Sequence, residues 1–367
     1  MQENKLYLAV LHSLWISHKK FHSIFDNNLF KENKNYKEFY EKINLELLKK
    51  YWFKEEEINS ILKRKKELKI SFIKNKLEER DVKIIICDEK NFPQELKSIS
   101  NSPYLIYVRW KILDWPKIAV VGSRNITSYW KKVIENIIPD ISRYFIIISG
   151  WAYWVDTTAH LETLKSWNKT IAVIWTSISE DYPTGNKKMY DEIIENNWAI
   201  ISIFAIWVPW NAYNFPIRNE IVAGLSSWVV VIEAREKSWS LITSKLALDL
   251  WKDLFAVPGE IFKSNSVWCN NLIKNWEAKL VTSSIDILEE YNFSNNKELE
   301  NNLEKPKLEF SDELEEKIYN SLLLEWFTAD ELVKKFNLDI STISFKLSML
   351  EINWIIKKTL WWKFEVK

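Results

Sequence analysis

The sequence predicts an α/β protein whose centre is a Rossmann-like, doubly wound and mostly parallel β-sheet. Apolar runs of about four to six residues recur between residues 117 and 258, and helical patterns of apolar residues separate them. Each strand–helix unit spans about 25–35 residues, which fits parallel strands joined by crossover helices. Turns with glycine and serine follow two of the runs, at 122–123 and 149–150. In such sheets the ligand site lies at the carboxyl ends of the strands, where both turns fall.

Residues 1–80 predict a small helical domain. Apolar residues stand at helical spacing around residues 11–16, and Trp15 and Trp52 fall at turns between helical patterns. If these two tryptophans stand for glycine, the pattern is that of a helix–hairpin–helix unit. Such units contact the DNA backbone or other proteins, and the sequence leaves both roles open.

Residues 81–286 predict the sheet domain. Its first strand is VKIIIC at 82–87, and a proline-bounded extended segment leads from it to the main strand. Amphipathic helices are expected between the strands that follow. In chain order these strands are IAVV, FIIIS, TIAVI, AIISIF, VVVIEA and DLFAVP.

The C-terminal part predicts a linker and a third domain. Residues 287–307 are rich in Asn, Glu and Lys and poor in apolar residues, as linkers are. Residues 308–367 predict a winged-helix domain with three helices and a terminal β-hairpin. Thr328 is the expected N-cap of the second helix, and Ile343, Leu347 and Leu350 form the apolar side of the third. The third helix exposes one lysine and no arginine, which favours protein contact over DNA contact.

Composition limits the function. The net charge is +1, so any nucleic-acid site is a local patch. Cys87 and Cys269 form no CxxC pair and are expected to be reduced thiols. Three of the four histidines lie in the N-terminal region without a thiol or carboxylate at ligand spacing, so we expect no metal. The sequence has no run of 18 apolar residues and no signal peptide, which predicts a cytoplasmic protein without membrane contact.

Tryptophan and glycine have unusual frequencies. The chain has 21 Trp and 5 Gly, which together make 26, and glycine at its usual frequency of about 7% would account for roughly 26 residues. Trp151, Trp154, Trp175 and Trp239 fall in strand-to-helix turns, where a positive φ or close backbone approach makes glycine the default. We therefore expect that these residues are encoded by UGA, read here as tryptophan and in the gene's own lineage as glycine. The alternative is a natural tryptophan-rich chain with UGG codons.

Four segments of the sheet domain carry groups suited to phosphate and base contacts. Strand-end turns supply backbone N–H groups and hydroxyls, and two helices begin with polar side chains, where anions are attracted. An exposed aromatic side chain suits base stacking. The candidate residues are Gly122, Ser123, Arg124, Ser149, Gly150, Phe215, Arg218, Asn219, Ser240 and Thr243.

The same segments contain no recognisable catalytic set. Neither a Ser-His-Asp or Cys-His arrangement nor converging carboxylates can be read from the sequence, and Asp156 and His160, at i and i+4, fit a helix cap and a helix contact. A GxGxxG turn with a distant acidic residue and a GK[ST] loop are both missing. We therefore expect a phosphate-binding platform that is not an enzyme and has no cofactor.

At these residues the chain resembles the DNA-processing protein A family (DprA, also called Smf). The resemblance is dense over residues 85–285, and the N- and C-terminal regions resemble, more loosely, the SAM-like and winged-helix domains of the family. The family would have glycine at seven tryptophan positions, which are Trp130, Trp154, Trp175, Trp228, Trp239, Trp268 and Trp276. The matching runs are VVGSRNITSYW, ISGWAYWVDTTAH, TIAVIWTSISEDYPTGN, FPIRNEIVAGLS, VVVIEAREKSWSLITSKLA, LFAVPGEI and NLIKNWEAKLV.

The resemblance implies a non-enzymatic protein that binds single-stranded DNA during natural transformation (competence). It also implies protection of the incoming strand, loading of the RecA recombinase, and a homodimer formed through the Rossmann-like domain. The turns at 122–124 and 149–150 would line the phosphate pocket, residues 215–219 would extend it with Phe215 offered to a base, and Ser240 and Thr243 would close it. Real tryptophans at 151, 154 and 239 would block this pocket.

Two alternatives stay open from the sequence. One is a nucleotide-processing enzyme of the phosphoribohydrolase type, in which Glu233 would be the nearest carboxylate, although the PGGxGT-type turn of such enzymes is missing. The other is a transcriptional regulator that binds duplex DNA through the winged helix.

Overall fold

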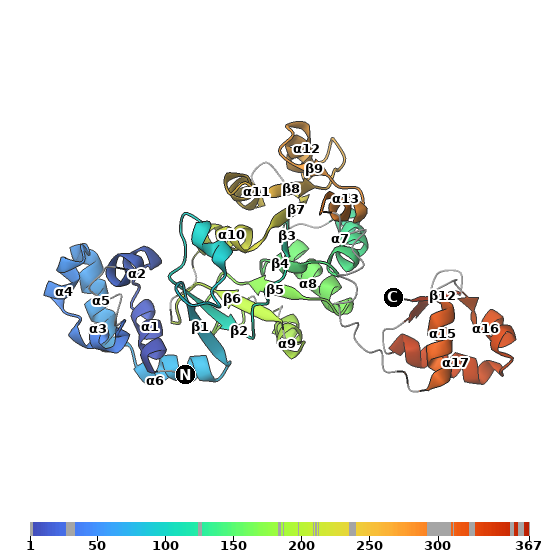
Figure 1. The fold of residues 1–367 in the computed structure, drawn as a ribbon, viewed down its shortest axis with the longest axis horizontal. Coiled ribbons are helices and arrows are strands. Elements are labelled where there is room, and N and C mark those ends of the chain that lie inside the picture. Colours follow the sequence, from blue (N-terminus) through green and yellow to red (C-terminus); the bar gives the residue numbers. More distant parts are fainter. Residues whose placement is uncertain are drawn as a thin grey trace. The chain divides into compact units, whose positions relative to one another are not determined.

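The larger part of the chain is built around one sheet. The computed structural model describes residues 3–26, 34–123, 127–182, 185, 187–196, 198–207, 209, 211, 213–234, 240–291, 310, 312–322, 327–352, 356–358 and 363–366. The chain divides into two units, residues 1–301 and 302–367. In the larger unit helices surround a central sheet, and the smaller unit combines helices with a short sheet (Figure 1).

The central sheet has nine strands in the order β1-β2-β6-β5-β4-β3-β7-β8-β9. The pairs β1–β2 and β2–β6 are antiparallel, and all other neighbours are parallel, so the predicted mostly parallel sheet is confirmed. The six predicted strands after residue 117 are β3 to β8. The bounds are β1 Val82–Ile86, β2 Leu105–Arg109, β3 Lys117–Gly122, β4 Ile146–Ser149, β5 Thr170–Val173, β6 Ala199–Ser202, β7 Trp228–Glu233, β8 Asp253–Ala256 and β9 Lys279–Leu280.

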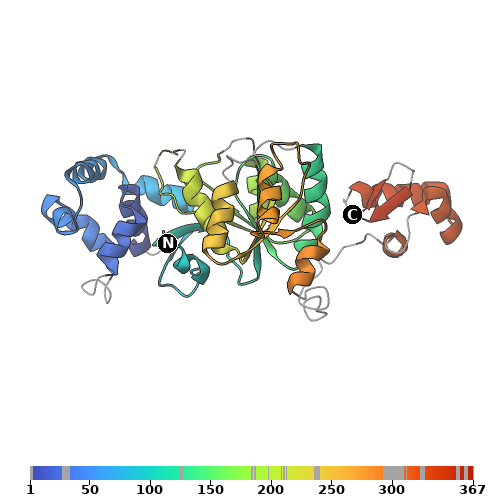
Figure 2. The ribbon, with the colours of Figure 1, turned by 90° about the horizontal axis from the view of Figure 1, so that it is seen from above.

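Helices cover both faces of this sheet, which forms the middle of three layers (Figures 1 and 2). Alternate side chains of β3 show the two faces: Ala119 and Val121 share a cluster with α10, α11 and α12, and Ile118 and Val120 share one with α7, α8 and α13. The bounds are η1 Gln94–Ser98, α7 Ser128–Ile141, α8 Val155–Lys165, α9 Lys187–Glu195, α10 Asn214–Leu225, α11 Ser240–Asp249, α12 Val267–Lys274, α13 Ile285–Leu288 and η3 Glu289–Tyr291.

The helical region that the sequence predicts before the sheet is present, and its described residues form six helices. They share one apolar cluster with β1, β2 and β6, so the helical region packs directly on the sheet. Trp15 and Trp52 lie at turns with φ of 69° and 64°. The helices are α1 Glu3–Ser13, α2 His18–Phe25, α3 Tyr36–Lys42, α4 Leu45–Lys50, α5 Glu55–Glu67 and α6 Ile70–Glu78.

Two buried histidines form part of this contact. The Nδ1 atom of His12 lies 3.0 Å from the hydroxyl of Tyr107. His18 Nε2 lies 3.0 Å from the carbonyl oxygen of Ile203, and its Nδ1 accepts from the backbone N–H of Tyr104 at 3.2 Å. Burial lowers the pKa of His18 to about 4 and the pKa of His12 well below its usual value. Both rings are therefore neutral near pH 7.

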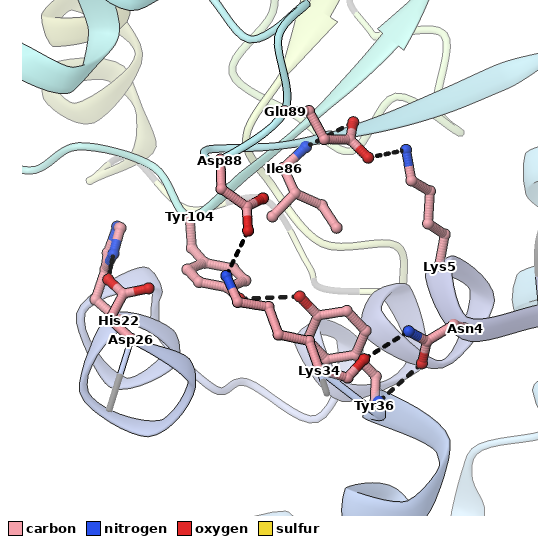
Figure 3. A network of polar contacts seen from close by, with 10 residues as sticks. All are labelled: Asn4, Lys5, His22, Asp26, Lys34, Tyr36, Ile86, Asp88, Glu89 and Tyr104. Carbon is pink, nitrogen blue, oxygen red and sulfur yellow. Dashed lines mark hydrogen bonds and ion pairs between the residues drawn. The ribbon is translucent and has the colours of Figure 1, made fainter. Parts of the chain in front are cut away.

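A polar network continues the contact between the first helices and the start of the sheet (Figure 3). The hydroxyls of Tyr36 and Tyr104 lie 2.9 Å apart, and Asn4 Oδ1 accepts from the backbone N–H of Tyr36 at 2.8 Å. Two ion pairs cross the same boundary, Lys5 with Glu89 at 2.6 Å and Lys34 with Asp88 at 2.6 Å. Because hydrogen bonds and ion pairs are directional, they fix the position of the N-terminal helices relative to β1 and β2.

The smaller unit has the element order expected from the sequence. Its strands form an antiparallel sheet in the order β10-β12-β11. Thr328 is the N-cap of α16 and forms a capping box with Glu331, and Ile343, Leu347 and Leu350 of α17 are at most 1% exposed, as predicted. The predicted hairpin tip at 361–362 lies outside the described residues, and the winged-helix assignment stays a prediction. The bounds are α15 Glu313–Leu322, β10 Phe327–Thr328, α16 Ala329–Phe336, α17 Ile340–Ile352, β11 Ile356–Lys358 and β12 Lys363–Val366.

The predicted domain limits also stay predictions. The 80/81 limit falls between α6 and β1, within the larger unit, and residues 287–291 of the predicted linker belong to α13 and η3. In the described part of the chain, no helix combines the length and the apolar character that crossing a bilayer requires.

Positive backbone φ angles occur mainly at tryptophan. Ten described residues other than glycine have a positive φ, and eight of them are tryptophan, whereas no described glycine has one. The eight are Trp15, Trp52, Trp110, Trp154, Trp167, Trp207, Trp251 and Trp276. A bulky residue rarely adopts this conformation, which glycine adopts at no steric cost.

Candidate nucleic-acid interface

The first two predicted turns lie side by side at the carboxyl edge of the sheet. Gly122 ends β3 and Ser149 ends β4, and these strands are hydrogen-bonded neighbours. The hydroxyl of Ser149 donates to the carbonyl oxygen of Val120 at 2.6 Å, and the side chain is fully buried. Ser123 is buried as well, and Arg124 lies outside the described residues. The serine hydroxyl at the end of β4 therefore holds the two strands together.

Glycine is required at position 150 because Arg218 passes beneath it. A Cβ atom at Gly150 would lie 1.5 Å from Arg218 Nη1 and 2.4 Å from Asp156 Oδ2. Arg218 is only 3% exposed, and its Nη1 donates to the carbonyl oxygen of Val173 at 3.1 Å. It also lies 3.6 Å from Asp156 Oδ2. The sequence presents Arg218 as a phosphate ligand, but in this structure it supports the turn from below.

Asp156 and His160 of α8 complete the support of this turn. Asp156 accepts from the backbone N–H of Ala152 at 3.1 Å. His160 Nε2 lies 2.9 Å from the carbonyl oxygen of Gly150, which can only accept, so Nε2 carries the proton and Nδ1 faces Thr170 Oγ1 at 2.6 Å. Burial, and the charge of Arg218, lower the pKa of His160 to about 4. Asp156 is thus not the N-cap of α8, which is Trp154, and both residues bond the turn that precedes the helix.

The start of α10 brings the predicted aromatic residue to the same edge. Phe215 is half-buried, and its ring stacks on the indole of Trp175 with centroids 4.0 Å apart. The amide of Asn214 donates to the carbonyl oxygen of Trp175 at 3.1 Å, which ties α10 to the residues after β5. Asn219 is buried at 8% exposure. The face of Phe215 that the sequence offers to a base is thus covered by tryptophan.

The fourth predicted group lies on α11, which follows β7, the other neighbour of β3. Ser240 is the first residue of this helix, but its side chain is outside the described part of the structure. Thr243 is 1% exposed, so its hydroxyl is directed into the protein. The predicted contacts of Ser240 and Thr243 with DNA stay predictions.

Two tryptophans lie in the turn after β4, and each is energetically unfavourable there. Trp154 has φ 85° and ψ −107°, a conformation that L side chains rarely adopt. Trp151 is fully buried between His160 and Tyr190, and its indole N–H has no hydrogen-bond partner among the described residues. A buried donor without a partner costs about 1–3 kcal/mol. Neither tryptophan is accommodated without strain.

One cluster elsewhere could hold a metal ion. The ligand atoms of His22, Asp26 and Cys87 all lie within 4.8 Å of one another. His22 therefore does have the neighbours that the sequence analysis did not expect, because Asp26 follows it by one helical turn and Cys87, directly after β1, lies beside both. The ring of His22 already bonds Asp26 at 2.6 Å and the carbonyl of Ser102 at 3.2 Å. These hydrogen bonds account for the cluster without an ion, and the absence of a metal stays a prediction.

Sequence reasoning missed Tyr182 and the supporting role of Val173. Tyr182 lies edge-on to Trp175, with centroids 5.0 Å apart. No pattern in the sequence marks a single tyrosine in a loop. The side chains that the structure does bring together at one edge are those of Phe215, Arg218 and Ser149, beside Gly122 and Gly150.

Comparison with known proteins decides the family. A family model described as DNA recombination-mediator protein A matches residues 83–292, more than half of the 367 residues. The chain belongs to this family. The DNA processing protein DprA of Streptococcus pneumoniae is 39% identical over 204 residues, 55% of this chain and 72% of the relative. The protein of the same name from Bacillus subtilis is 33% identical over 216 residues, which are 58% of this chain and 72% of the relative.

Two solved structures of the family are similar. The X-ray structure of DprA from S. pneumoniae has a TM-score of 0.66 and 28% identity, and the match covers 79% of this chain and 99% of that one. A structure described as the single-stranded DNA binding mode of DprA from Helicobacter pylori has a TM-score of 0.52 and 26% identity. The match covers 58% of this chain and 96% of that one. The resemblance read from the sequence is confirmed.

Proposed function

We propose that this protein binds single-stranded DNA along the carboxyl edge of its central sheet and acts as a recombination mediator. The observation that carries the proposal is the turn at Gly150, where buried charged groups hold the backbone so closely that no side chain fits. A backbone held this way can approach a phosphate, and a rigid turn costs less entropy on binding. The H. pylori relative, whose printed description names single-stranded DNA, supports the choice of ligand.

The roles of the site residues follow from their places. The backbone of Gly122, Ser123 and Gly150 and the side chain of Arg124 contact the phosphates, and the buried hydroxyl of Ser149 holds the ends of β3 and β4 together. Phe215 stacks on a base, Ser240 adds the start of α11, and the buried Thr243 supports that start. Arg218 and Asn219, being buried, position the turn and the start of α10 rather than contact the strand.

In the cell the bound strand is protected and transferred to a RecA-type recombinase during natural transformation. The protein works in the cytoplasm as a homodimer that pairs through the sheet unit. Light scattering measures the dimer, and strand exchange by RecA in the presence of a single-strand-binding protein measures the loading. A monomeric protein would contradict the homodimer, and strand exchange that the protein leaves unchanged would contradict the loading of RecA.

A titration tests DNA binding. A labelled single strand of about 16 nucleotides is titrated with the full chain carrying glycine in place of Trp151, Trp154, Trp175 and Trp239. We expect tight binding at low salt and a log–log salt dependence, because phosphate contacts release counterions. In this background Arg124→Ala lowers the salt slope by about one.

The matched control is Lys83→Ala, since Lys83 is exposed on β1, five strands away from β3. It leaves affinity and slope unchanged. Failure of the chain to bind at low salt contradicts the proposal, and so does equal loss of affinity in both variants. For the enzyme alternative, Glu233 is 1% exposed and would have to move to reach a substrate.

A further inference from the structure

Two loops beside the proposed DNA site are held by residues of the N-terminal helical region. The β5 loop, residues 174–186, joins β5 to α9 and contains Tyr182. The β6 loop, residues 203–213, joins β6 to α10 and leads to Phe215. Both loops leave the carboxyl edge of the sheet, where ligands bind in sheets of this kind. Their conformation therefore bears on any strand that lies there.

Arg80 holds the β5 loop. It stands between α6 and β1, and its Nη1 atom donates to Oδ1 of Asp181 at 2.6 Å. Arg80 is itself held, because Nε of Arg109, the last residue of β2, donates to its carbonyl oxygen at 3.0 Å. The residue after Asp181 is Tyr182. The ion pair therefore fixes the β5 loop directly beside the aromatic residues of the site.

Arg64 of α5 holds the β6 loop. Its Nη2 atom donates to the carbonyl oxygen of Trp207 at 3.1 Å, and its Nε atom donates to that of Ser13, at the end of α1, at 3.3 Å. Both acceptors are backbone atoms, so these bonds do not depend on the indole of residue 207. His18 Nε2 lies 3.0 Å from the carbonyl oxygen of Ile203, where the loop begins. The β6 loop is thus held at two points along its length.

Apolar packing strengthens both attachments. Ile178 of the β5 loop and Ile206 of the β6 loop are fully buried in the same cluster as the N-terminal helices. The β6 loop leads directly into α10, whose Arg218 lies beneath Gly150. A shift of this loop would therefore displace Phe215 and the support of the phosphate turn together.

We propose that the N-terminal helical region positions the DNA site, with Arg64 and Arg80 holding the two loops in the conformation that binds a single strand. The inference rests on the proposed function, because it concerns the same site at the carboxyl edge. Both arginines are positioning residues and do not contact the strand. The side chains of Arg80 and Asp181 are 21% and 26% exposed, and ion pairs this close to solvent contribute little to overall stability. Loss of this pair frees the loop and leaves the protein folded.

Asp181 offers the sharpest test, because its charge and its position predict opposite results. The glycine-substituted chain of the DNA titration is compared with its Asp181→Ala, Arg80→Ala and doubly substituted variants. Removing a carboxylate near phosphates would tighten binding if charge alone mattered. We expect instead that each variant binds the single strand about fivefold more weakly, and that the double variant loses no more than either. Asp181→Asn keeps an acceptor for Arg80 and should retain most of the affinity.

Arg64 is tested against its neighbour on α5. Lys63 is exposed and has no hydrogen bond or ion pair among the described residues, so Lys63→Ala is the matched control. Arg64→Ala should weaken binding about fivefold to tenfold and leave the salt slope unchanged, because no phosphate contact is lost. Lys63→Ala should change neither quantity. A slope that falls by about one in Arg64→Ala would show direct contact with DNA and overturn its positioning role.

A measurement without DNA separates this inference from the proposed function. In Asp181→Ala the backbone amides of residues 177–182 should exchange hydrogen faster than in the parent chain, while the urea midpoint stays the same. Unchanged exchange, or tighter DNA binding by Asp181→Ala, overturns the inference and leaves the proposed function standing. If the parent chain itself fails to bind the strand at low salt, the proposed function and the inference both fall.

Discussion

Replacing Trp52, Trp167 and Trp251 by glycine should stabilise the larger unit, because each residue is held in a left-handed conformation. Such a conformation costs a residue with a Cβ about 1–2 kcal/mol. Glycine gives back about 0.5–1 kcal/mol through the greater freedom of its unfolded chain. The three side chains are 86%, 59% and 96% exposed, so little apolar burial is lost. The net gain is about 1 kcal/mol for each site.

The three sites follow three different helices and share no hydrogen-bond partner among the described residues, so the gains should add to about 3 kcal/mol. Urea denaturation of the single and triple variants measures the free energy of unfolding. The matched controls are the alanine variants, which remove the indole but keep the Cβ and so keep most of the strain. If glycine proves less stabilising than alanine at each position, the explanation by backbone strain is refuted.

Three further predictions concern the site and its supports. Gly150→Ala should cost about 1–3 kcal/mol and weaken DNA binding, since its Cβ would overlap Arg218 Nη1; unchanged urea midpoints would contradict this. Burial lowers the pKa of His18 and His160 from 6.5 to about 4. The unfolded chain binds protons in that window that the folded chain does not, so stability is full above pH 6.5 and falls toward pH 4 by on the order of 3 kcal/mol for each group; midpoints that rise on acidification would reverse the sign. Thr328→Ala should lower the stability of the smaller unit by about 1 kcal/mol through loss of the capping box, and Thr328→Ser should keep it.

The sheet could be predicted from the sequence because its strands are buried on both faces and therefore read as continuous apolar runs. The turns at Gly122 and Gly150 followed from the ends of those runs. Burial of Arg218 could not be predicted, because an arginine in the first turn of a helix looks the same whether it faces solvent or interior. Its burial depends on a carbonyl from β5 and a carboxylate from α8, which the fold alone brings together.

The N-terminal histidines show the same limit. At the level of the sequence they enter only as candidate metal ligands, and the packing of α1 and α2 on β2 makes His12 and His18 buried and neutral. For the tryptophan positions, in contrast, the sequence alone carried the information. Composition and turn chemistry indicated glycine, and the positive φ angles support that expectation at eight of them.

Crosslinking shows where on the protein a bound single strand lies, and we expect it across the carboxyl edge of the sheet. A strand containing iodouracil is bound to the chain carrying glycine in place of Trp151, Trp154, Trp175 and Trp239, irradiated and digested, and the crosslinked residues are identified by mass spectrometry. We expect crosslinks at Phe215 or Tyr182 and in the peptides that contain residues 122–124 and 149–155. Crosslinks confined to the N-terminal helices or to residues 302–367 would contradict it.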